Sequence, residues 1–354
     1  MSEKLTEAGR QLRALPTSRT RSALVGGVFP WMGYEEASRQ QLARKVAELE
    51  QKIETLLAGG GGEVPVPPTP EPEPEPTNVV RVPIGTSLPR FGAAAAGTQF
   101  QLERGGQWQR IDLGGGKDYS IAAYGDTAKP LPKLRGGGIF VPANSQRIVI
   151  SQLDIADCAI GMNVVKDAGV RAITLKDSYI ARTSDSGIID YSDDSQFMNL
   201  TLDQNGAAGT ASHAIYANGR RTLVQGCKIT RAAKNGVSLR MDGQRVIDND
   251  IQGTSIGIAY FTELDPATMK GGPANQIRGN DISGCSVAMY ISAAGGWPGG
   301  SEPPKPWVYP PFDIDNNNIM SPIGMKQGIM CEIPVRSHVG NTFVGDFSVK
   351  EKYV

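Results

Sequence analysis

The sequence is poor in the side chains that most often bind metal ions or transfer protons. It has two histidines and four cysteines among 354 residues, and no two cysteines form a CxxC pair. A structural zinc site needs closely spaced Cys or His ligands, so this class of site is disfavoured. A Walker-type GxxxxGK[ST] segment and an HExxH motif are also missing. We therefore expect no metal ion and no cofactor.

An excess of one charge and long apolar runs are missing as well. The chain carries 36 basic and 36 acidic side chains, which gives no indication of a nucleic-acid partner or an anionic membrane surface. No apolar run approaches the roughly 18 residues that a membrane span needs. The N-terminus, MSEKLTEAGR, is charged where a secretory signal would become apolar. We expect synthesis in a reducing cytosol, no disulfides and no membrane partner.

Aromatic residues are few, whereas glycine and proline are abundant. Only 6% of residues are aromatic, against 43 glycines and 24 prolines, a mixture typical of short strands joined by tight turns. Many prolines alternate with glutamate in residues 59–78, after four glycines. Such a segment adopts an extended, polyproline-like conformation that like-charge repulsion stiffens. It predicts a linker between two domains.

Residues 1–58, before this linker, are predicted to be helical and to form an anchoring segment. Apolar residues from Leu5 to Leu15 recur every three or four positions, and Pro16 ends this helix. A second helix begins near Glu35 and carries an a/d seam made of Leu42, Val46, Leu49, Ile53 and Leu56. Two heptads are too short to be stable alone, so the seam indicates either a coiled coil or an ordinary amphipathic helix. The residue types at a and d favour two strands.

Residues 139–354 contain an internal repeat. Its first strands end at Ile155, Ile180, Leu202, Ile229, Ile251, Ile282, Ile319 and Phe343, with spacings of 22 to 37 residues. A second short strand follows each marker: IGMNV, GIIDY, HAIYA, GVSLR, GIAYF, VAMYI, GIMCE and DFSVK. A period just above 20 with Gly, Asn and Asp turns predicts an all-β fold, a parallel β-helix of about eight coils. We expect residues 79–138 to form irregular strands that enter and cap it.

Aligning the repeats predicts which side chains stack. One inward column comprises Ile188, Ala214, Val237, Ile258, Ala288 and Ile329, and the next comprises Asp190, Tyr216, Leu239, Tyr260, Tyr290 and Cys331. In the second column Asp190 is the exception, because a buried carboxylate needs partners. In four coils an asparagine lies two positions before the marker residue: Asn249, Asn280, Asn317 and Asn341. This repeat predicts a ladder of amide hydrogen bonds from coil to coil.

The coil pattern resembles the right-handed parallel β-helix of the pectin-lyase-like superfamily, over about 210 residues. That fold includes lyases, hydrolases, epimerases and binding proteins, so it does not define an activity. The order of helical anchor, stiff spacer and β-helix resembles a bacteriophage virion spike, either a tailspike or a head-decoration fibre. The resemblance implies a homotrimer, although the a/d residues do not support three strands. It also implies attachment to capsid or tail proteins through residues 1–58 and exposure on the virion surface after assembly in the host cytoplasm.

Aromatic residues near two long excursions indicate a glycan-binding surface. Residues 262–279 and 292–316 both leave the end of a second strand in adjacent coils, and should wall off a groove. The outward column beside them reads Tyr191, Ala217, Arg240, Phe261 and Ile291, and the second excursion adds Trp297, Trp307 and Tyr309. Aromatic faces pack on sugar rings, and arginine bridges the carboxylates of acidic polysaccharides. The same aromatic residues could instead seal a subunit interface.

Two groups of residues are candidates for catalysis. Carboxylates gather at Asp190, Asp193, Asp194 and Asp203, with Asp185 close by. They could supply the carboxylate pair of a glycosidase or bind calcium, but Asp and Ser also stabilise tight turns through local hydrogen bonds. His213 begins a strand, with Arg220 and Arg221 in the next turn, and this trio could serve a lyase or an epimerase. The DPH-type motif of the resembling epimerases is absent, and a single histidine at a strand start is often structural.

Together these patterns favour a virion spike or decoration protein that presents its β-helix to host-surface polysaccharide. The alternative is a tailspike depolymerase, a glycoside hydrolase or lyase that cleaves capsule or O-antigen polysaccharide through the aspartate group. A third option is a bacterial surface or secreted carbohydrate enzyme. The sequence does not decide whether the protein is an enzyme.

Overall fold

The computed structural model describes residues 78–353 apart from 167–168, 208, 210, 262–271 and 293–309. The chain divides into two units, Met1–Glu73 and Pro74–Val354, and the described residues belong to the second. The predicted anchor, with its seam from Leu42 to Leu56, lies outside the described residues, and so does nearly all of the linker. In the described ranges, no helix combines the length and apolar character of a membrane span.

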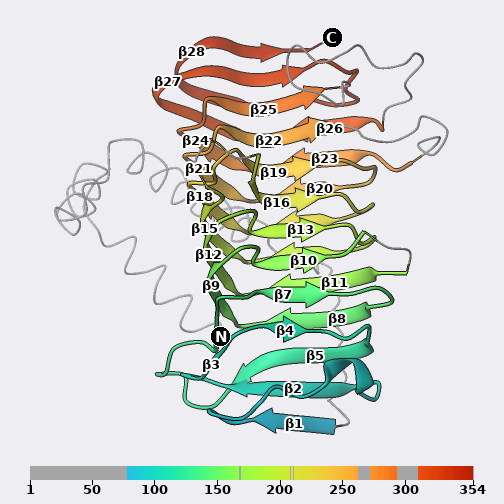
Figure 1. Cartoon of the computed structure of the whole chain (residues 1–354). Helices are drawn as coiled ribbons and strands as arrows, with labels where there is room; N and C mark the ends of the chain where they lie inside the picture. The colour runs from blue at the N-terminus through green and yellow to red at the C-terminus, as the bar shows by residue number, and fades with distance from the viewer. Residues whose placement is uncertain are drawn as a thin grey trace, which may run out of the picture. The chain divides into compact units, whose positions relative to one another are not determined.

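The second unit is a parallel β-solenoid whose strands stack in three columns (Figure 1). Face A is a 10-stranded sheet of β1 (Asn78–Val82), β2 (Thr98–Glu103), β5 (Lys117–Tyr124), β8 (Gln146–Ser151), β11 (Arg171–Lys176), β14 (Gln196–Met198), β17 (Leu223–Gln225), β20 (Arg245–Ile247), β23 (Asn275–Arg278) and β26 (Phe312–Asp315). Face B contains β3 (Gln107–Trp108), β6 (Lys133–Arg135), β9 (Asp154–Cys158), β12 (Tyr179–Thr183), β15 (Thr201–Asn205), β18 (Lys228–Thr230), β21 (Asp250–Gln252) and β24 (Asp281–Ser283).

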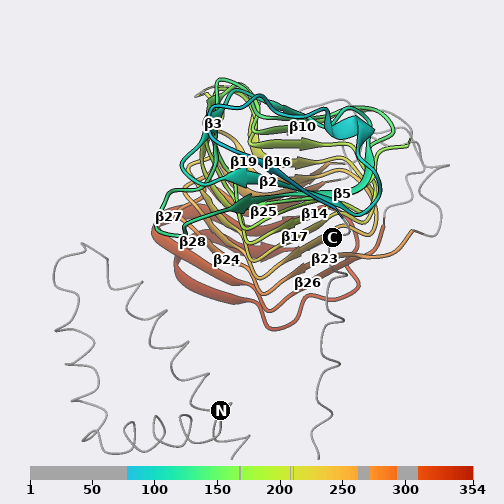
Figure 2. The same ribbon diagram turned by 90° about the horizontal axis from the view of Figure 1, so that it is seen from below.

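Face C contains β4 (Ile111–Asp112), β7 (Ile139–Val141), β10 (Met162–Val164), β13 (Ile188–Asp190), β16 (His213–Ala217), β19 (Asn235–Leu239), β22 (Ile256–Phe261) and β25 (Val287–Ser292). The long strands β27 (Asn318–Cys331) and β28 (Thr342–Lys352) run through both face B and face C. A short 3-10 helix, Phe91–Ala93, lies near the first coil. Seen along the solenoid axis, the strands of each column overlie one another (Figure 2).

The predicted marker residues stack in one column on face B. Each is the register partner of the next, from Ile155 through Ile180 to Ile319 and Phe343. The same column continues toward the N-terminus through Leu134 and Trp108. The parallel stack therefore starts before Ile139, and residues 79–138 join it instead of forming a separate irregular entry region. The strands β3, β4 and β6 of this region have only two or three residues, which obscures the period there.

The register on face C differs by one residue from the prediction in two coils. The observed inward columns are Ile188, Ile215, Val237, Ile258, Met289 and Ile329, and then Asp190, Ala217, Leu239, Tyr260, Ile291 and Cys331. Tyr216 and Tyr290, predicted to point inward, therefore face outward, while Ala217 and Ile291, predicted to face outward, are fully buried. A slip of one residue in a strand reverses the side that each side chain faces.

The slip arises because Ala214 and Ala288 occupy the tight corner where Gly187, Gly236 and Gly257 stand in other coils. At Gly187 a Cβ would lie 2.6 Å from the carbonyl oxygen of Ala214, and at Gly257 it would lie 2.6 Å from that of Ala288. This corner takes only very small side chains. The alanines are part of the corner and not of the apolar column.

The asparagine ladder is confirmed. The Asn249 Nδ2 donates to Asn280 Oδ1 at 2.9 Å, and Asn280 Nδ2 donates to Asn317 Oδ1 at 2.9 Å. Asn317 Nδ2 continues the chain to Asn341 Oδ1 at 3.0 Å. Each amide also donates to a backbone carbonyl, and each Oδ1 also accepts from a backbone N–H in the preceding coil. The ladder thus satisfies buried polar groups at one turn of four successive coils.

The C-terminal edge of face A is covered by the segment after β27. Ser337 bridges to Asp313 of β26, whose side chain is only 1% exposed. Arg278 and Arg336 both pair with that carboxylate, so the pKa of Asp313 is lowered, mainly by its hydrogen bond to Arg336. These contacts close the edge that a solenoid end would otherwise expose.

Candidate functional site

Outward-facing side chains of face C form the candidate site. Because neighbouring residues of a strand point to opposite sides, the residue after each inward column member faces outward. These residues are Tyr191, Asn218, Arg240 and Phe261, from four successive coils. Tyr216 faces outward earlier in β16, level with Ile189 and Ser238 in the adjoining coils.

Several of these outward-facing residues contact one another and the adjacent His213. This contact group is named the face-C cluster and consists of Tyr191, His213, Tyr216, Arg240 and Phe261. The Tyr216 ring lies at its centre, 6.0 Å from the Tyr191 ring in an edge-on arrangement and 5.5 Å from the His213 ring in a nearly parallel stack. The Arg240 guanidinium lies 4.9 Å from the centre of the Tyr216 ring and 5.2 Å from that of Phe261. A cation therefore sits between two aromatic rings.

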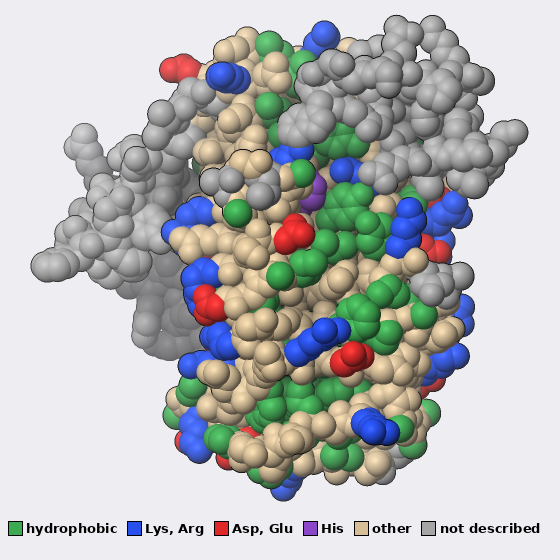
Figure 3. Space-filling view, viewed as in Figure 1, with side chains coloured by type: hydrophobic (Ala, Val, Ile, Leu, Met, Phe, Trp, Pro, Cys, Tyr) green, Lys and Arg blue, Asp and Glu red, His purple; other side chains and the backbone are tan. Residues whose placement is uncertain are grey.

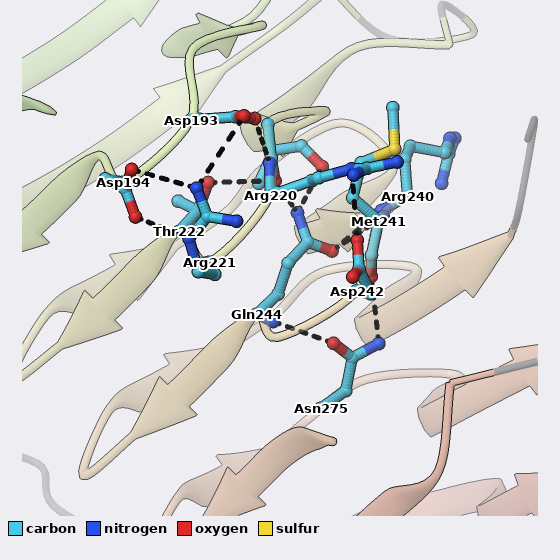
Figure 4. Close-up of polar contacts among 12 residues, drawn as sticks. Asp193, Asp194, Arg220, Arg221, Thr222, Arg240, Met241, Asp242, Gln244 and Asn275 are labelled. Carbon is cyan, nitrogen blue, oxygen red and sulfur yellow. Dashed lines mark hydrogen bonds and ion pairs between the residues drawn. The ribbon is translucent and has the colours of Figure 1, made fainter. Parts of the chain in front are cut away.

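Arg240 is held in place by hydrogen bonds on both sides. Its Nη1 donates to Ser238 Oγ at 2.9 Å and to the Leu239 carbonyl at 3.0 Å. Its backbone N–H and that of Met241 donate to Gln244 Oε1, both at 3.0 Å (Figure 4). Only 8% of the residue is exposed. The guanidinium is therefore ordered before any ligand arrives.

The turn that carries Arg240 is anchored to both adjoining coils. Gln244 Nε2 donates to the carbonyls of Ala217 and Gly219, at 3.0 and 2.7 Å. From the other side, Asn275 accepts the Gln244 N–H at 2.7 Å and donates to the Met241 carbonyl at 3.0 Å (Figure 4). These amides were not identified from the sequence. A buried Gln and Asn at matching turn positions of successive coils would have been the signal.

The face-C cluster contains one cation, Arg240, and Lys166 and Lys234 lie near it. Burial, together with the positive charges of Arg240 and Lys234, lowers the pKa of His213 to about 3. His213 is therefore neutral at neutral pH. The Lys166 ammonium lies 5.9 Å from the Tyr191 ring centre. On this side of the solenoid, hydrophobic, basic and acidic side chains all lie near a histidine (Figure 3).

The structure does not gather the four candidate aspartates on one surface. Asp193 accepts from the Arg220 N–H at 2.9 Å, and Asp194 pairs with Arg221 at 2.6 Å, in the turn between faces C and A (Figure 4). Asp203 lies on face B, where it pairs with Arg231 and accepts from Thr230.

Asp190 points into the solenoid and is completely buried. Its carboxylate accepts from the hydroxyls of Ser192, Ser195 and Thr222, at 2.5, 3.3 and 3.3 Å. Burial raises the pKa of Asp190 to about 6, although these hydrogen bonds oppose the shift. The sequence correctly indicated a buried carboxylate with partners. Its position is suited to holding the turn together and not to contacting a substrate.

Of the six predicted glycan-binding residues, Tyr191, Arg240 and Phe261 come together in the face-C cluster. The other three, Trp297, Trp307 and Tyr309, lie outside the described residues. His213 belongs to the cluster, but Arg220 instead pairs with Asp242, at 3.3 Å. Tyr216 was not predicted as a site residue, because the one-residue slip in register placed its side chain inside the solenoid.

The described part of the chain contains no group of three or more His, Cys, Asp or Glu side chains arranged to hold a metal ion.

No protein-family model matches this chain, and no curated protein matches it either. Among solved structures, it is similar to an alginate lyase from Paenibacillus sp. str. FPU-7, with a TM-score of 0.49 and 11% identity over 78% of this chain and 99% of that one. It is also similar to ORF18 of Geobacillus virus E2, with a TM-score of 0.39 and 12% identity over 71% of this chain and 54% of that one. A DFA-IIIase from Arthrobacter chlorophenolicus A6 aligns with a TM-score of 0.29 and 12% identity, over 77% and 84% of the two chains. These are similarities of fold, and none bears on what this chain binds.

Proposed function

We propose that this protein binds an acidic glycan through face C, as the host-contacting body of a virion spike. The observation that carries the binding proposal is the Arg240 guanidinium, held between the Tyr216 and Phe261 rings. Aromatic rings pack against the apolar faces of sugars, and a guanidinium forms paired hydrogen bonds with a carboxylate. The two features together fit a sugar that carries a carboxyl group.

Charge and order both favour this ligand class. Arg240 and Lys234 are close enough to His213 to lower its pKa, and Lys166 lies beside Tyr191, so positive charge extends across several coils. Because Arg240 is already fixed by Ser238 and the adjacent backbone, it loses little conformational freedom on binding. Preorganised cations of this kind suit a repeating anionic polymer.

The virion role rests on the order of segments in the sequence. A helical segment at 1–58 would attach to capsid or tail proteins, the Pro-Glu linker would extend the solenoid from the particle, and the assembly would be a homotrimer. In this arrangement the glycan-binding surface meets the host cell.

The binding proposal is tested by affinity electrophoresis of the full chain in gels that contain alginate, polygalacturonate or neutral dextran. We expect retardation by an acidic polymer, and about a tenfold or greater loss of affinity for Arg240→Gln, since a hydrogen bond to a charged group contributes about 1.5–3 kcal/mol. The matched control is Arg81→Gln, because Arg81 also lies over an aromatic ring, 5.7 Å from the centre of Tyr124, but on face A.

Two results would contradict glycan binding at face C. One is a loss of glycan affinity in the Arg240 variant that is absent or no larger than the loss in the Arg81 variant. The other is a change in oligomer size, measured by light scattering, in the Arg240 variant with its glycan affinity intact. The second result would assign the cluster to a subunit interface.

A further inference from the structure

Among the described residues, the face-C cluster contains no carboxyl group of its own, so it lacks the carboxylate pair of a glycosidase. Asp185 lies beside it, where its carboxylate accepts hydrogen bonds from Ser186 and Ser212. Glycosidases need two carboxyl groups roughly 5–10 Å apart across the scissile bond. Of the candidate carboxylates, Asp190 faces the interior, and Asp193 and Asp194 are engaged with Arg220 and Arg221 in a turn. A glycan lying on face C would instead meet phenol, imidazole, guanidinium and amide groups.

These groups match the needs of a different reaction, β-elimination at a uronic acid. That reaction needs a cation to stabilise the negative charge that develops on the carboxyl group. It also needs a group that removes the proton on the carbon next to the carboxylate, and one that protonates the departing oxygen. One side chain can perform both proton transfers if it lies on the correct side of the sugar.

Tyr216 is the side chain placed for this role. It is partly exposed, whereas His213, Asn218 and Arg240 around it are buried except for 5 to 8% of their surface. The Asn218 Nδ2 donates to the Tyr216 hydroxyl oxygen at 3.4 Å, and Arg240 lies over the ring at 4.9 Å. The hydroxyl is thus directed by an amide and accompanied by a fixed positive charge.

His213 acts as a positioning residue. It stacks on the Tyr216 ring with an interplanar angle of 13°, and its own backbone N–H donates to Ser186 Oγ at 3.3 Å. Its imidazole is neutral, and its Nδ1 is buried with no hydrogen-bond partner among the described residues. It therefore fixes the plane of the phenol ring without adding a charge beside it.

We propose that the face-C cluster is the active site of a polysaccharide lyase, with Tyr216 as the catalytic residue and Arg240 as the carboxylate-binding residue. The substrate class is a glycan of 4-linked uronic acids in which the glycosidic oxygen, on the carbon β to the carboxyl group, lies on the same face of the sugar as the hydrogen on C5, as in mannuronate or glucuronate. This inference rests on the proposed binding of acidic glycan at the same surface.

The step balances without a further reactant. As the phenolate, Tyr216 takes the proton from C5, the released electron pair forms the C4–C5 double bond, and the bond from C4 to the glycosidic oxygen breaks. The phenol then returns the same proton to that oxygen. One product ends in an unsaturated uronate, and the other gains a hydroxyl group. No electrons are exchanged with another molecule, and no water is consumed.

The test uses the full chain with alginate, which contains mannuronate, or with another polyuronate of 4-linked mannuronate or glucuronate that the electrophoresis shows to be bound. Elimination is followed by the ultraviolet absorbance of the unsaturated uronate, and total cleavage by new reducing ends. We expect Tyr216→Phe to lower the elimination rate by about 10²-fold or more, as for loss of a general acid or base, with glycan retardation retained. The matched control is Tyr290→Phe, from the same outward column, whose hydroxyl is bonded to Glu332 at 2.8 Å.

Each outcome has a distinct meaning. If the wild-type chain binds a polyuronate but releases no unsaturated product, or produces reducing ends without absorbance, the lyase inference is overturned and glycan binding stands. If Tyr216→Phe cleaves at the wild-type rate, Tyr216 is not the catalytic residue. If no acidic polymer is retarded, the proposed binding function fails, and the lyase inference fails with it.

Discussion

A single buried carboxylate, Asp190, gives the solenoid a specific dependence on pH. Its pKa is raised to about 6 by burial in the folded state, whereas it is near 3.8 when the chain is unfolded. The folded state therefore holds the proton more tightly. Its favourable contribution to stability is fully present below pH 3.8 and is lost as the pH rises through about 6.

Through this residue alone, we expect the free energy of unfolding of the wild-type protein to fall by up to about 3 kcal/mol between pH 4 and 7. The Asp190→Asn variant should lack that part of the pH dependence. Urea unfolding of both proteins at pH 4, 5.5 and 7 gives the difference between their free energies of unfolding at each pH. The contributions of other carboxylates cancel in this difference. Asp194→Asn is the control, since that side chain lies in an exposed pair with Arg221. Parallel stability curves for wild type and Asp190→Asn would contradict this account.

At this scale the sequence predicted partners for Asp190 but not the outward position of Tyr216. The inward position of Asp190 and the outward position of Tyr216 both follow from the register of neighbouring strands. A one-residue slip in the coil of β16 reversed the predicted side of Tyr216 but left that of Asp190 unchanged. Ala214 caused the slip, because alanine fits equally well in an apolar column and in a glycine-like corner. Residue identity alone cannot separate these two environments.

Among the elements, the asparagine ladder is the most completely predicted feature, because identical side chains recur at one position before the markers. Each amide uses both its donor and its acceptor within the turn. Its loss would leave several buried backbone groups without partners, and that is more costly than the loss of one hydrogen bond.

We expect Asn280→Ala to destabilise the solenoid by at least about 2 kcal/mol, since Val246 O and the Asn249 N–H would both lose their partner. The midpoint of urea unfolding provides the measurement. Asn163→Ala, on the outward surface of β10, should change stability by less than about 0.5 kcal/mol. Similar effects of the two substitutions would show that the ladder does not contribute to folding.

For the whole molecule, the repeat predicted a parallel solenoid because every coil must bury its apolar column on the next one. The candidate site was only partly predictable, since outward positions carry no repeated pattern. Tyr191, Arg240 and Phe261 were found from their place beside the long excursions. Lys166, Asn218 and Lys234 were not, because nothing in their type or spacing distinguishes them from ordinary turn residues.

The proposed virion role predicts that deletion of residues 1–58 leaves a folded solenoid that no longer joins a virus particle. The chain divides at Glu73, beyond the deleted segment, so the second unit keeps all its described strands. Circular dichroism and thermal unfolding should match those of the full chain, while co-sedimentation with virions should be lost. Incorporation of the truncated chain into particles would show that attachment lies elsewhere.

The stacking of the face-C cluster has a consequence for how such a protein can diversify. Tyr191, Tyr216 and Arg240 belong to successive coils, so their separation is set by main-chain hydrogen bonds between rungs, about 4.8 Å for each rung. The connections that leave face C can then lengthen or shorten without moving these side chains relative to one another. Under the proposed glycan binding, variation in the excursions would change which polymer reaches face C, while the spacing of the cluster side chains would be inherited unchanged.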